Sequence, residues 1–146
     1  MRRIDLLMPI MNARLDLCRQ KGFDSVDADN MDGYTNTTDF PLTATDQLAC
    51  NATIANAAHA RGLTIALKND LDQIPQLVSY YDWAVNEQCF HYQECGLLAP
   101  FSSAGKAIMT IEYKGALKKY CPAANALNFN PLKKTLALKS PRKSCR

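Results

Sequence analysis

The stretch GFDSVDADNMDGY at residues 22–34 decides the fold that we expect for this chain. It opens with a glycine, a residue suited to end a helix. Apolar and polar residues then alternate from Phe23 to Asp29, which is typical of a half-buried strand. The strand ends in carboxylates that repel one another unless something uses them. Taken alone, this end fits a polar turn as well as a site, because Asp and Asn also form turns.

Strand-like runs that end in charged or amide side chains recur along the chain. We expect five strands, at residues 23–29, 63–70, 82–89, 106–113 and 133–138. We expect helical segments between them, at residues 4–21, 43–61, 75–80 and 94–104, with residues 114–130 as helix or loop. Pro9 should stand in the first turn of the first helix, because proline does not fit a helix interior. Alternating strands and helices predict a parallel α/β fold.

In a parallel α/β fold the carboxyl ends of the strands form the edge that faces the ligand. The residues expected to gather there are Asp27, Asp29, Lys68, Asp70, Asn86, Glu87 and Glu112. Two carboxylates from different strands can cleave a glycosidic bond, as acid and nucleophile or as acid and base. Lys68 either holds one of them ionised or forms a structural ion pair. A Mg²⁺ or Ca²⁺ site built from Asp27, Asp29 and Glu112 is an alternative, although no ligand spacing is diagnostic of one.

Other catalytic motifs are missing from the sequence. There is no glycine-rich phosphate loop and no Gly-x-Ser-x-Gly nucleophile elbow. The aromatic heptad at residues 89–95 carries His91, which we place toward the cleft. Its residues Phe90 and Tyr92 fit two roles equally, stacking on sugar rings or packing in the core. Because there is no phosphate loop and no diagnostic spacing of metal ligands, we expect neither a cofactor nor a metal.

The composition fits one soluble globular domain. The chain has 146 residues, of which 47% are hydrophobic and 21% charged, with a net charge of +3. The basic segment that begins at Lys133 lacks acids and interleaved aromatics, so we interpret it as a solvated tail and expect no nucleic-acid partner. No apolar run is long enough to span a membrane. The first nine residues are too short and too soon interrupted for a secretion signal.

The six cysteines favour an oxidising compartment. Cys89 and Cys95 are close enough to bridge a small loop, and a Cys121–Cys145 bridge can hold the C-terminal segment. Cys18 and Cys50 fit buried small hydrophobes or free thiols. Six unpaired thiols in an intracellular protein remain the alternative.

Several motifs together resemble glycoside hydrolase family 114. They are ARLDLC at 13–18, KGFD at 21–24, DN at 29–30, DGY at 32–34, FPLT at 40–43, LKND at 67–70, AVNEQC at 84–89 and IEY at 111–113. The resemblance covers nearly the whole chain. It implies an endo-α-1,4-polygalactosaminidase-like enzyme with a TIM-barrel fold, a secreted location and a role in carbohydrate metabolism.

The resemblance also implies a site and a substrate. It implies catalytic carboxylates at Asp29 and Glu87, and substrate contacts at Asp27, Asn30, Asp32, Tyr34, Lys68, Asp70 and Glu112. The substrate it implies is a cationic galactosamine polysaccharide, which suits an acidic cleft. Position 27 is Asp where the family often has Glu, so its carboxylate reaches less far.

The match implies a single domain over residues 1–146, a partial (β/α)8 barrel made of about the last five strand–helix units. An incomplete barrel leaves strand edges open. We therefore expect either a glycoside hydrolase or, as the alternative, a catalytically inactive remnant that binds carbohydrate.

Overall fold

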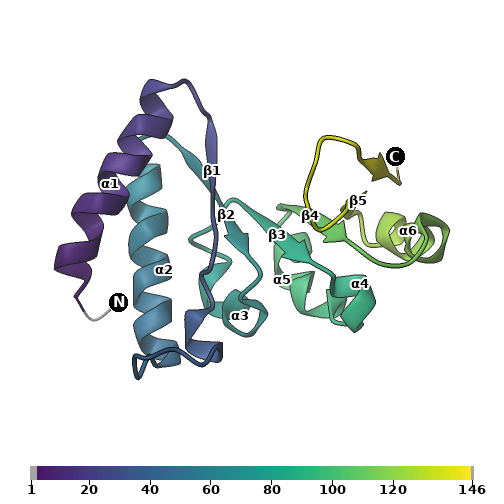
Figure 1. The fold of residues 1–146 in the computed structure, drawn as a ribbon, viewed down its shortest axis with the longest axis horizontal. Coiled ribbons are helices and arrows are strands. Elements are labelled where there is room, and N and C mark those ends of the chain that lie inside the picture. Colours follow the sequence, from purple (N-terminus) through teal and green to yellow (C-terminus); the bar gives the residue numbers. More distant parts are fainter. Residues whose placement is uncertain (1–2, 146) are drawn as a thin grey trace. The chain divides into compact units, whose positions relative to one another are not determined.

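The computed structural model describes residues 3–145, and these form two compact units that divide after Asp82. Each unit combines parallel strands with helices, as Figure 1 shows for the whole chain. The α/β class predicted from the sequence is therefore confirmed within each unit. The two units are described in turn. None of the helices among residues 3–145 is both long and apolar enough to cross a membrane.

The first unit packs two long helices beside a pair of parallel strands (Figure 1). Its elements in chain order are α1 (Ile4–Gln20), β1 (Ser25–Ala28), the 3₁₀ turn η1 (Gly33–Thr35), α2 (Ala44–His59), β2 (Thr64–Lys68), the 3₁₀ turn η2 (Leu71–Gln73) and α3 (Ile74–Leu77). Strand β2 is buried from Ile65 to Lys68, whereas β1 is partly exposed. The two strands run in the same direction, with Asp27 opposite Ala66. Their carboxyl ends therefore meet at one edge.

The ends of α2 follow from local sequence chemistry. The Thr43 hydroxyl accepts the backbone N–H of Asp46 at 3.1 Å, and the Asp46 carboxylate accepts the backbone N–H of Thr43 at 3.0 Å. This capping box satisfies two N–H groups that the first helical turn leaves without partners. Gly62 lies beyond the other end at φ +69°, a backbone conformation that side chains other than glycine disfavour. The predicted helix start is thus confirmed.

Pro9 is an exception to the sequence prediction. Helix α1 already begins at Ile4, so Pro9 lies inside it rather than in its first turn. The helix tolerates the proline by giving up one backbone hydrogen bond to the residue four positions earlier. The prediction that placed Pro9 in the first turn was wrong because it treated this loss as prohibitive.

The second unit is built on three parallel strands. Its elements are β3 (Trp83–Glu87), α4 (Cys89–Tyr92), the 3₁₀ turn η3 (Cys95–Leu98), α5 (Ala99–Ser103), β4 (Ala107–Glu112), α6 (Leu117–Ala126), β5 (Asn130–Lys133) and β6 (Lys143–Ser144). Strand β4 lies between β3 and β5 and is parallel to both, and β6 adds an antiparallel edge. Phe101, Ile108 and Phe129 are fully buried in this core.

The last predicted strand was misplaced. It was expected at residues 133–138, but β5 covers Asn130–Lys133. The buried residues are Phe129 and Pro131, whereas Leu136 is 78% exposed and Leu138 is 50% exposed. Leu136 and Leu138 alternate with polar or small residues as in a strand, but both are exposed. A proline is compatible with a strand wherever the ladder does not need its N–H.

Two disulfide bonds hold the second unit. Cys89 bonds to Cys95 and Cys121 bonds to Cys145, so both predicted pairings are confirmed. Cys18 and Cys50 are free thiols, and Cys50 is buried. The first bridge closes the loop directly after β3, and the second fastens the C-terminal segment to α6.

Candidate functional site

The strand ends of each unit carry a cluster of polar side chains. The first cluster, at the ends of β1 and β2, contains Asp27, Asp29, Asn30, Asp32, Tyr34, Lys68 and Asp70. The second cluster, at the ends of β3 and β4, contains Glu87, Glu112 and Tyr113. The clusters belong to different units, and the geometry of each is given by itself.

In the first cluster Asp29 is paired with Lys68. The Lys68 ammonium lies 3.0 Å from Asp29 Oδ1. Side-chain exposure is 10% for Lys68 and 65% for Asp29, so a nearly buried cation faces a carboxylate that solvent can reach. The hydrogen bond from Lys68 lowers the pKa of Asp29 below its usual value, against a smaller effect of burial. Asp29 is therefore held as the charged carboxylate.

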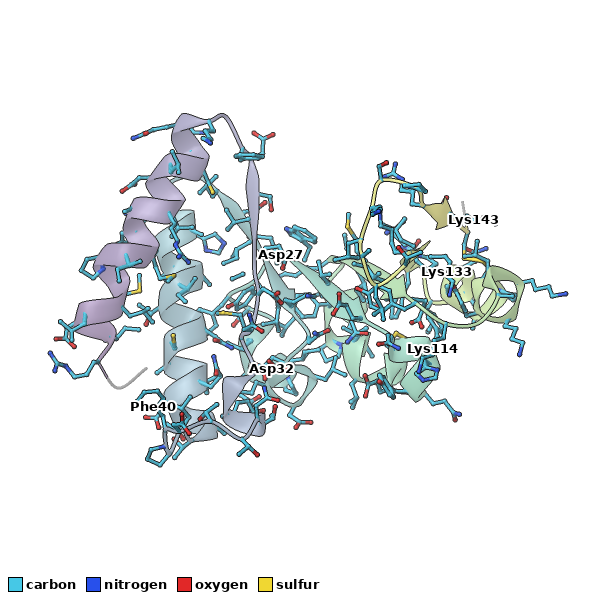
Figure 2. The ribbon with its side chains drawn as sticks, viewed as in Figure 1. Asp27, Asp32, Phe40, Lys114, Lys133 and Lys143 are labelled. Atoms are coloured by element: carbon cyan, nitrogen blue, oxygen red, sulfur yellow. A yellow bond between two sulfur atoms is a disulfide. The ribbon has the colours of Figure 1, made fainter. Side chains whose placement is uncertain are left out.

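Asp27 stands within β1, and Asp29 is the first residue beyond the end of that strand. Figure 2 shows Asp27 on β1 and Asp32 farther along the same chain segment. Asn30 separates them with φ 57°, a left-handed conformation that asparagine adopts more readily than most residues. This residue turns the chain from the strand into the Asp32 loop.

Asp70 is the buried carboxylate of the first cluster, with 3% of its surface exposed. Its Oδ2 accepts a hydrogen bond of 2.9 Å from the Asn51 side-chain amide. Burial raises the pKa of Asp70 to about 6. The Tyr34 hydroxyl and the Asn51 amide oppose this rise, whereas the charges of Asp32 and Asp72 add to it.

Tyr34 shares this environment. Burial, and then the negative charge of Asp70, raise the pKa of Tyr34 to about 12. Its hydroxyl therefore stays protonated at neutral pH and remains a hydrogen-bond donor. The structure thus brings Asp32, Tyr34 and Asp70 into one electrostatic group, which joins a strand-end residue to two residues that only the family resemblance had implied.

Two polar residues of α2 complete the first cluster, and the sequence analysis missed them. The Asn51 amide also donates to the backbone carbonyl of Met31 at 2.9 Å, and Gln47 Nε2 donates to Asn51 Oδ1 at 2.6 Å. Both side chains are fully buried. They join the Asp32 loop to Asp70. Their spacing of four residues on the buried helix face was the signal available in the sequence.

In the second cluster Glu87 ends β3 and is half-buried. The Tyr113 hydroxyl donates a hydrogen bond to Glu87 Oε1. Glu87 is paired in register with Ile111, so Tyr113, two positions further on, follows on the same side. Register and hydrogen bond together bring the phenol to the carboxylate.

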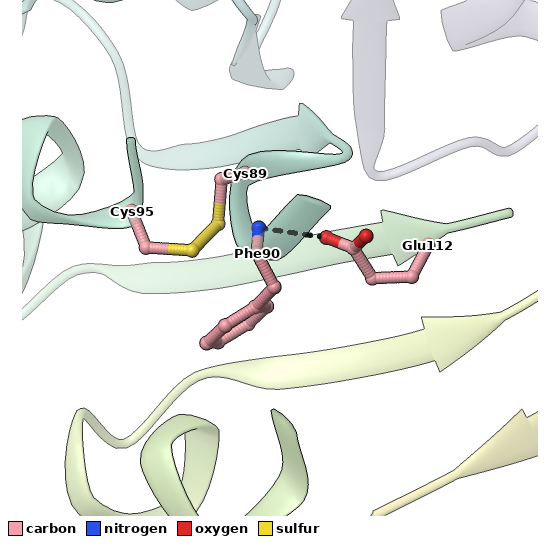
Figure 3. Close-up of a disulfide and its surroundings, with 4 residues drawn as sticks. All are labelled: Cys89, Phe90, Cys95 and Glu112. Carbon is pink, nitrogen blue, oxygen red and sulfur yellow. Dashed lines mark hydrogen bonds between the residues drawn. A yellow bond between two sulfur atoms is a disulfide. The ribbon is translucent and has the colours of Figure 1, made fainter. Parts of the chain in front are cut away.

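Glu112 lies on the opposite face of the sheet from Glu87, because it follows Ile111 by one position. It is 1% exposed, and its Oε1 accepts the backbone N–H of Phe90 at 3.0 Å (Figure 3). Burial raises the pKa of Glu112, while the backbone N–H groups of Phe90 and His91 lower it. The structure therefore does not bring Glu112 to Glu87.

The aromatic heptad contains one packed ring and one exposed ring. Phe90 stacks on Tyr120, with ring centroids 5.5 Å apart and planes 19° apart, and this is packing inside the unit. Tyr92 is 61% exposed and contacts His91 edge to face. A pocket of about 310 Å³ lies beside Glu112, and its lining includes Phe90, His91, Lys114, Lys119 and Tyr120.

Within residues 3–145, no three His, Cys, Asp or Glu side chains are grouped as metal ligands.

The model of glycoside-hydrolase family GH114 matches residues 2–146. The chain belongs to this family. The family predicted from the sequence motifs is thereby confirmed. Among curated proteins, none matches the chain.

The chain is similar to solved structures of glycoside hydrolases. A crystal structure of Ega3 from Aspergillus fumigatus in complex with galactosamine is 39% identical, with a TM-score of 0.88 over 94% of this chain and 60% of that one. The glycoside hydrolase domain of PelA from Pseudomonas aeruginosa is 15% identical, with a TM-score of 0.66 over 91% of this chain and 61% of that one. A variant of that domain has a TM-score of 0.65 at 14% identity, over the same shares.

The PelA structures support the fold alone, at their low identity. With Ega3 they confirm the predicted fold, a partial (β/α)8 barrel of the α/β class. The chain spans about three-fifths of the length of these structures.

Proposed function

We propose that the chain acts as a glycoside hydrolase on α-1,4-linked galactosamine polysaccharide. Membership in family GH114 supports hydrolysis of a glycosidic bond. The observation that carries the substrate is the 39% identity to Ega3, whose crystal structure contains galactosamine. The acidic residues of the first cluster suit a polymer that carries a positive charge on each deacetylated sugar.

We assign the two catalytic roles to Asp29 and Glu87. The nearby Lys68 ammonium and the lowered pKa of Asp29 support a residue that stays ionised and stabilises positive charge at the anomeric carbon. Glu87 is then the general acid that gives a proton to the leaving oxygen. Its position at the carboxyl end of a parallel strand supports this role.

We further propose that six residues of the first cluster contact the substrate: Asp27, Asn30, Asp32, Tyr34, Lys68 and Asp70. The raised pKa values of Tyr34 and Asp70 leave a neutral donor beside a buried carboxyl group, a pair suited to the hydroxyl and amino groups of an amino sugar. We also include Glu112 among the proposed substrate contacts, because the family resemblance implies it. Its hydrogen bond with the backbone N–H of Phe90 supports a second role, in which it holds the backbone of α4.

We also propose that the protein works outside the cell. Two disulfide bonds fit an oxidising environment and would be unusual in the cytosol.

The decisive test is the release of reducing ends from a deacetylated galactosamine polymer by the 146-residue chain. We expect Asp29→Asn and Glu87→Gln to lower the rate at least a thousandfold, since each removes a carboxylate of the pair. Asp39→Asn and Glu94→Gln make the same chemical changes outside the clusters and should leave the rate unchanged. Full activity in either cluster variant would refute the assignment.

One observation favours a second candidate, a domain that binds carbohydrate without cleaving it. The chain spans 60% of Ega3, so it supplies only part of the residues around that enzyme's barrel. Binding of galactosamine oligomers to the chain with no release of reducing ends would favour this candidate. Activity that disappears on chelation would instead favour the metal-dependent alternative.

A further inference from the structure

Tyr113 is the partner of Glu87, and its role goes beyond the assignments made so far. Its hydroxyl donates to Glu87 Oε1. Tyr113 follows the end of β4, whereas Glu87 ends β3, so the contact links two neighbouring strands at their carboxyl ends. Both residues are half-buried, which leaves the pair within reach of a substrate.

The main chain around this contact is fixed independently of Tyr113. The backbone N–H of Gln88 donates to the carbonyl of Ile111 at 2.8 Å, and that of Phe90 donates to Glu112 at 3.0 Å. The Cys89–Cys95 disulfide closes the same turn. The backbone on both sides of the contact therefore has its own supports, and the Tyr113 hydrogen bond acts on the side chain of Glu87.

Two adjacent residues, the last of β4 and the one after it, thus act near Glu87 in different ways. Glu112, on the opposite face of the sheet, accepts the backbone N–H of Phe90 and so holds the start of α4, three residues beyond Glu87 (Figure 3). Tyr113, on the same face as Glu87, sets how the carboxylate is turned. A general acid must point its proton at the leaving oxygen, and a displacement of about 1 Å lowers a rate by about a hundredfold.

We propose that Tyr113 is a positioning residue for the Glu87 carboxylate in the proposed hydrolysis. The phenol anchors one carboxylate oxygen and so restricts rotation of the side chain, which presents the carboxyl group to the substrate in one orientation. This inference rests on the proposed function, because it takes Glu87 as the general acid.

The test is Tyr113→Phe, which removes the hydroxyl and keeps the ring. We expect kcat on the galactosamine polymer to fall about ten- to a hundredfold while KM and the melting temperature stay as in the original chain. Tyr92→Phe removes an exposed hydroxyl from the end of α4 and should change neither kcat nor KM. A purely structural role for Tyr113 would instead lower the melting temperature and leave kcat unaltered.

A second measurement does not depend on turnover. The chain is labelled with ¹³C at its glutamate carboxyl groups. The Glu87 resonance should then shift and broaden in the Tyr113→Phe variant and stay in place in the Tyr92→Phe variant. An unchanged Glu87 resonance, or an unchanged kcat in a chain that Glu87→Gln inactivates, overturns the proposal. If Glu87→Gln retains activity, the proposed function fails instead, and the resonance still shows whether the contact holds the carboxylate.

Discussion

Asp70 in the first unit and Glu112 in the second are both buried carboxylates at strand ends, but their hydrogen-bond donors differ. Glu112 accepts a backbone N–H from Phe90, whereas Asp70 accepts a side-chain amide from Asn51. The charges that act on them differ as well. Burial raises the pKa of both carboxyl groups, but the charges of Asp32 and Asp72 add to the rise at Asp70, whereas those of His91 and Lys133 oppose it at Glu112.

Under the proposed function, this difference distinguishes Glu112, which a backbone N–H holds in place, from Asp70, which we expect to meet the substrate. A backbone donor is fixed by the fold, so the Glu112 contact ties α4 to β4 and opposing charges compensate it. Asp70 is held among acids that disfavour its charge, and a cationic or hydroxylated ligand relieves that penalty. Judged by burial alone, Asp70 and Glu112 would look like the same kind of carboxylate.

The largest expected effect is on stability, in Glu112→Ala. The change removes the acceptor of the Phe90 N–H and leaves a cavity, so we expect a loss of about 3 kcal/mol in the free energy of unfolding. Urea denaturation at pH 7 measures this loss. Glu112→Gln keeps an oxygen acceptor of similar size and should lose about 1 kcal/mol. Equal stability of the alanine variant and the original chain would contradict the structural role.

The next effect is a change in pH dependence, in Asp70→Asn. The folded chain raises the pKa of Asp70 from 3.8 to about 6, so the folded state binds the proton more tightly than the unfolded state. Its contribution to stability is therefore complete below pH 4 and is lost as the pH rises to 6. Asparagine cannot titrate, so Asp70→Asn should gain roughly 2 kcal/mol over the original chain between pH 4 and pH 7.

Asp72→Asn is the matched control, because Asp72 is exposed and affects Asp70 only by its charge. The Asp72→Asn substitution should lower the pKa of Asp70 slightly and keep most of the loss of stability between pH 4 and pH 7. Denaturation curves at pH 4, 5, 6 and 7 compare the variants. If the free energy of unfolding changed with pH in the same way for Asp70→Asn and the original chain, Asp70 would have an ordinary pKa.

The positions of most elements could be predicted because local rules decide them. The Thr43–Asp46 capping box and the alternating run before Asp29 both act over a few residues, and both gave the correct element. The last strand was misplaced because Leu136 and Leu138 alternate like a strand while lying exposed. Whether an alternating segment is buried depends on the rest of the fold, which the segment itself does not encode.

The residue types of the site could be predicted from the sequence. The face of the sheet on which each side chain lies was harder to predict. The strand-end rule brought Asp29 together with Lys68, whereas Tyr34, which lies near Asp70, was implied only by the family resemblance. The same rule grouped Glu112 with Glu87, although one position of register puts Glu112 on the other face. Asn51 escaped notice because its four-residue spacing from Gln47 indicates only a shared helix face, whereas its two acceptors lie on distant segments of the chain.

The smallest effect concerns the ion pair of the first cluster, in Lys68→Met. The change keeps the buried stem and removes the ammonium, so the pKa of Asp29 should return toward its usual value. Because the folded chain lowers this pKa, the pair stabilises above about pH 4 and its contribution disappears as the pH falls further. The loss at pH 7 should stay below about 1 kcal/mol, since the Asp29 side chain is 65% exposed and solvent screens the pair.

Lys68→Arg separates charge from shape at the same position. It keeps the cation and should preserve both the stability at pH 7 and the low pKa of Asp29, measured from its ¹³C carboxyl resonance between pH 2 and pH 6. In Lys68→Met the midpoint of that titration should move to higher pH, because the carboxylate has lost its nearest positive charge. Identical midpoints in the two variants would mean that Lys68 supports β2 rather than Asp29. The nearly buried Lys68 would then resemble Glu112, a charged group that serves the fold, and the contrast between the two units would rest on Asp70 alone.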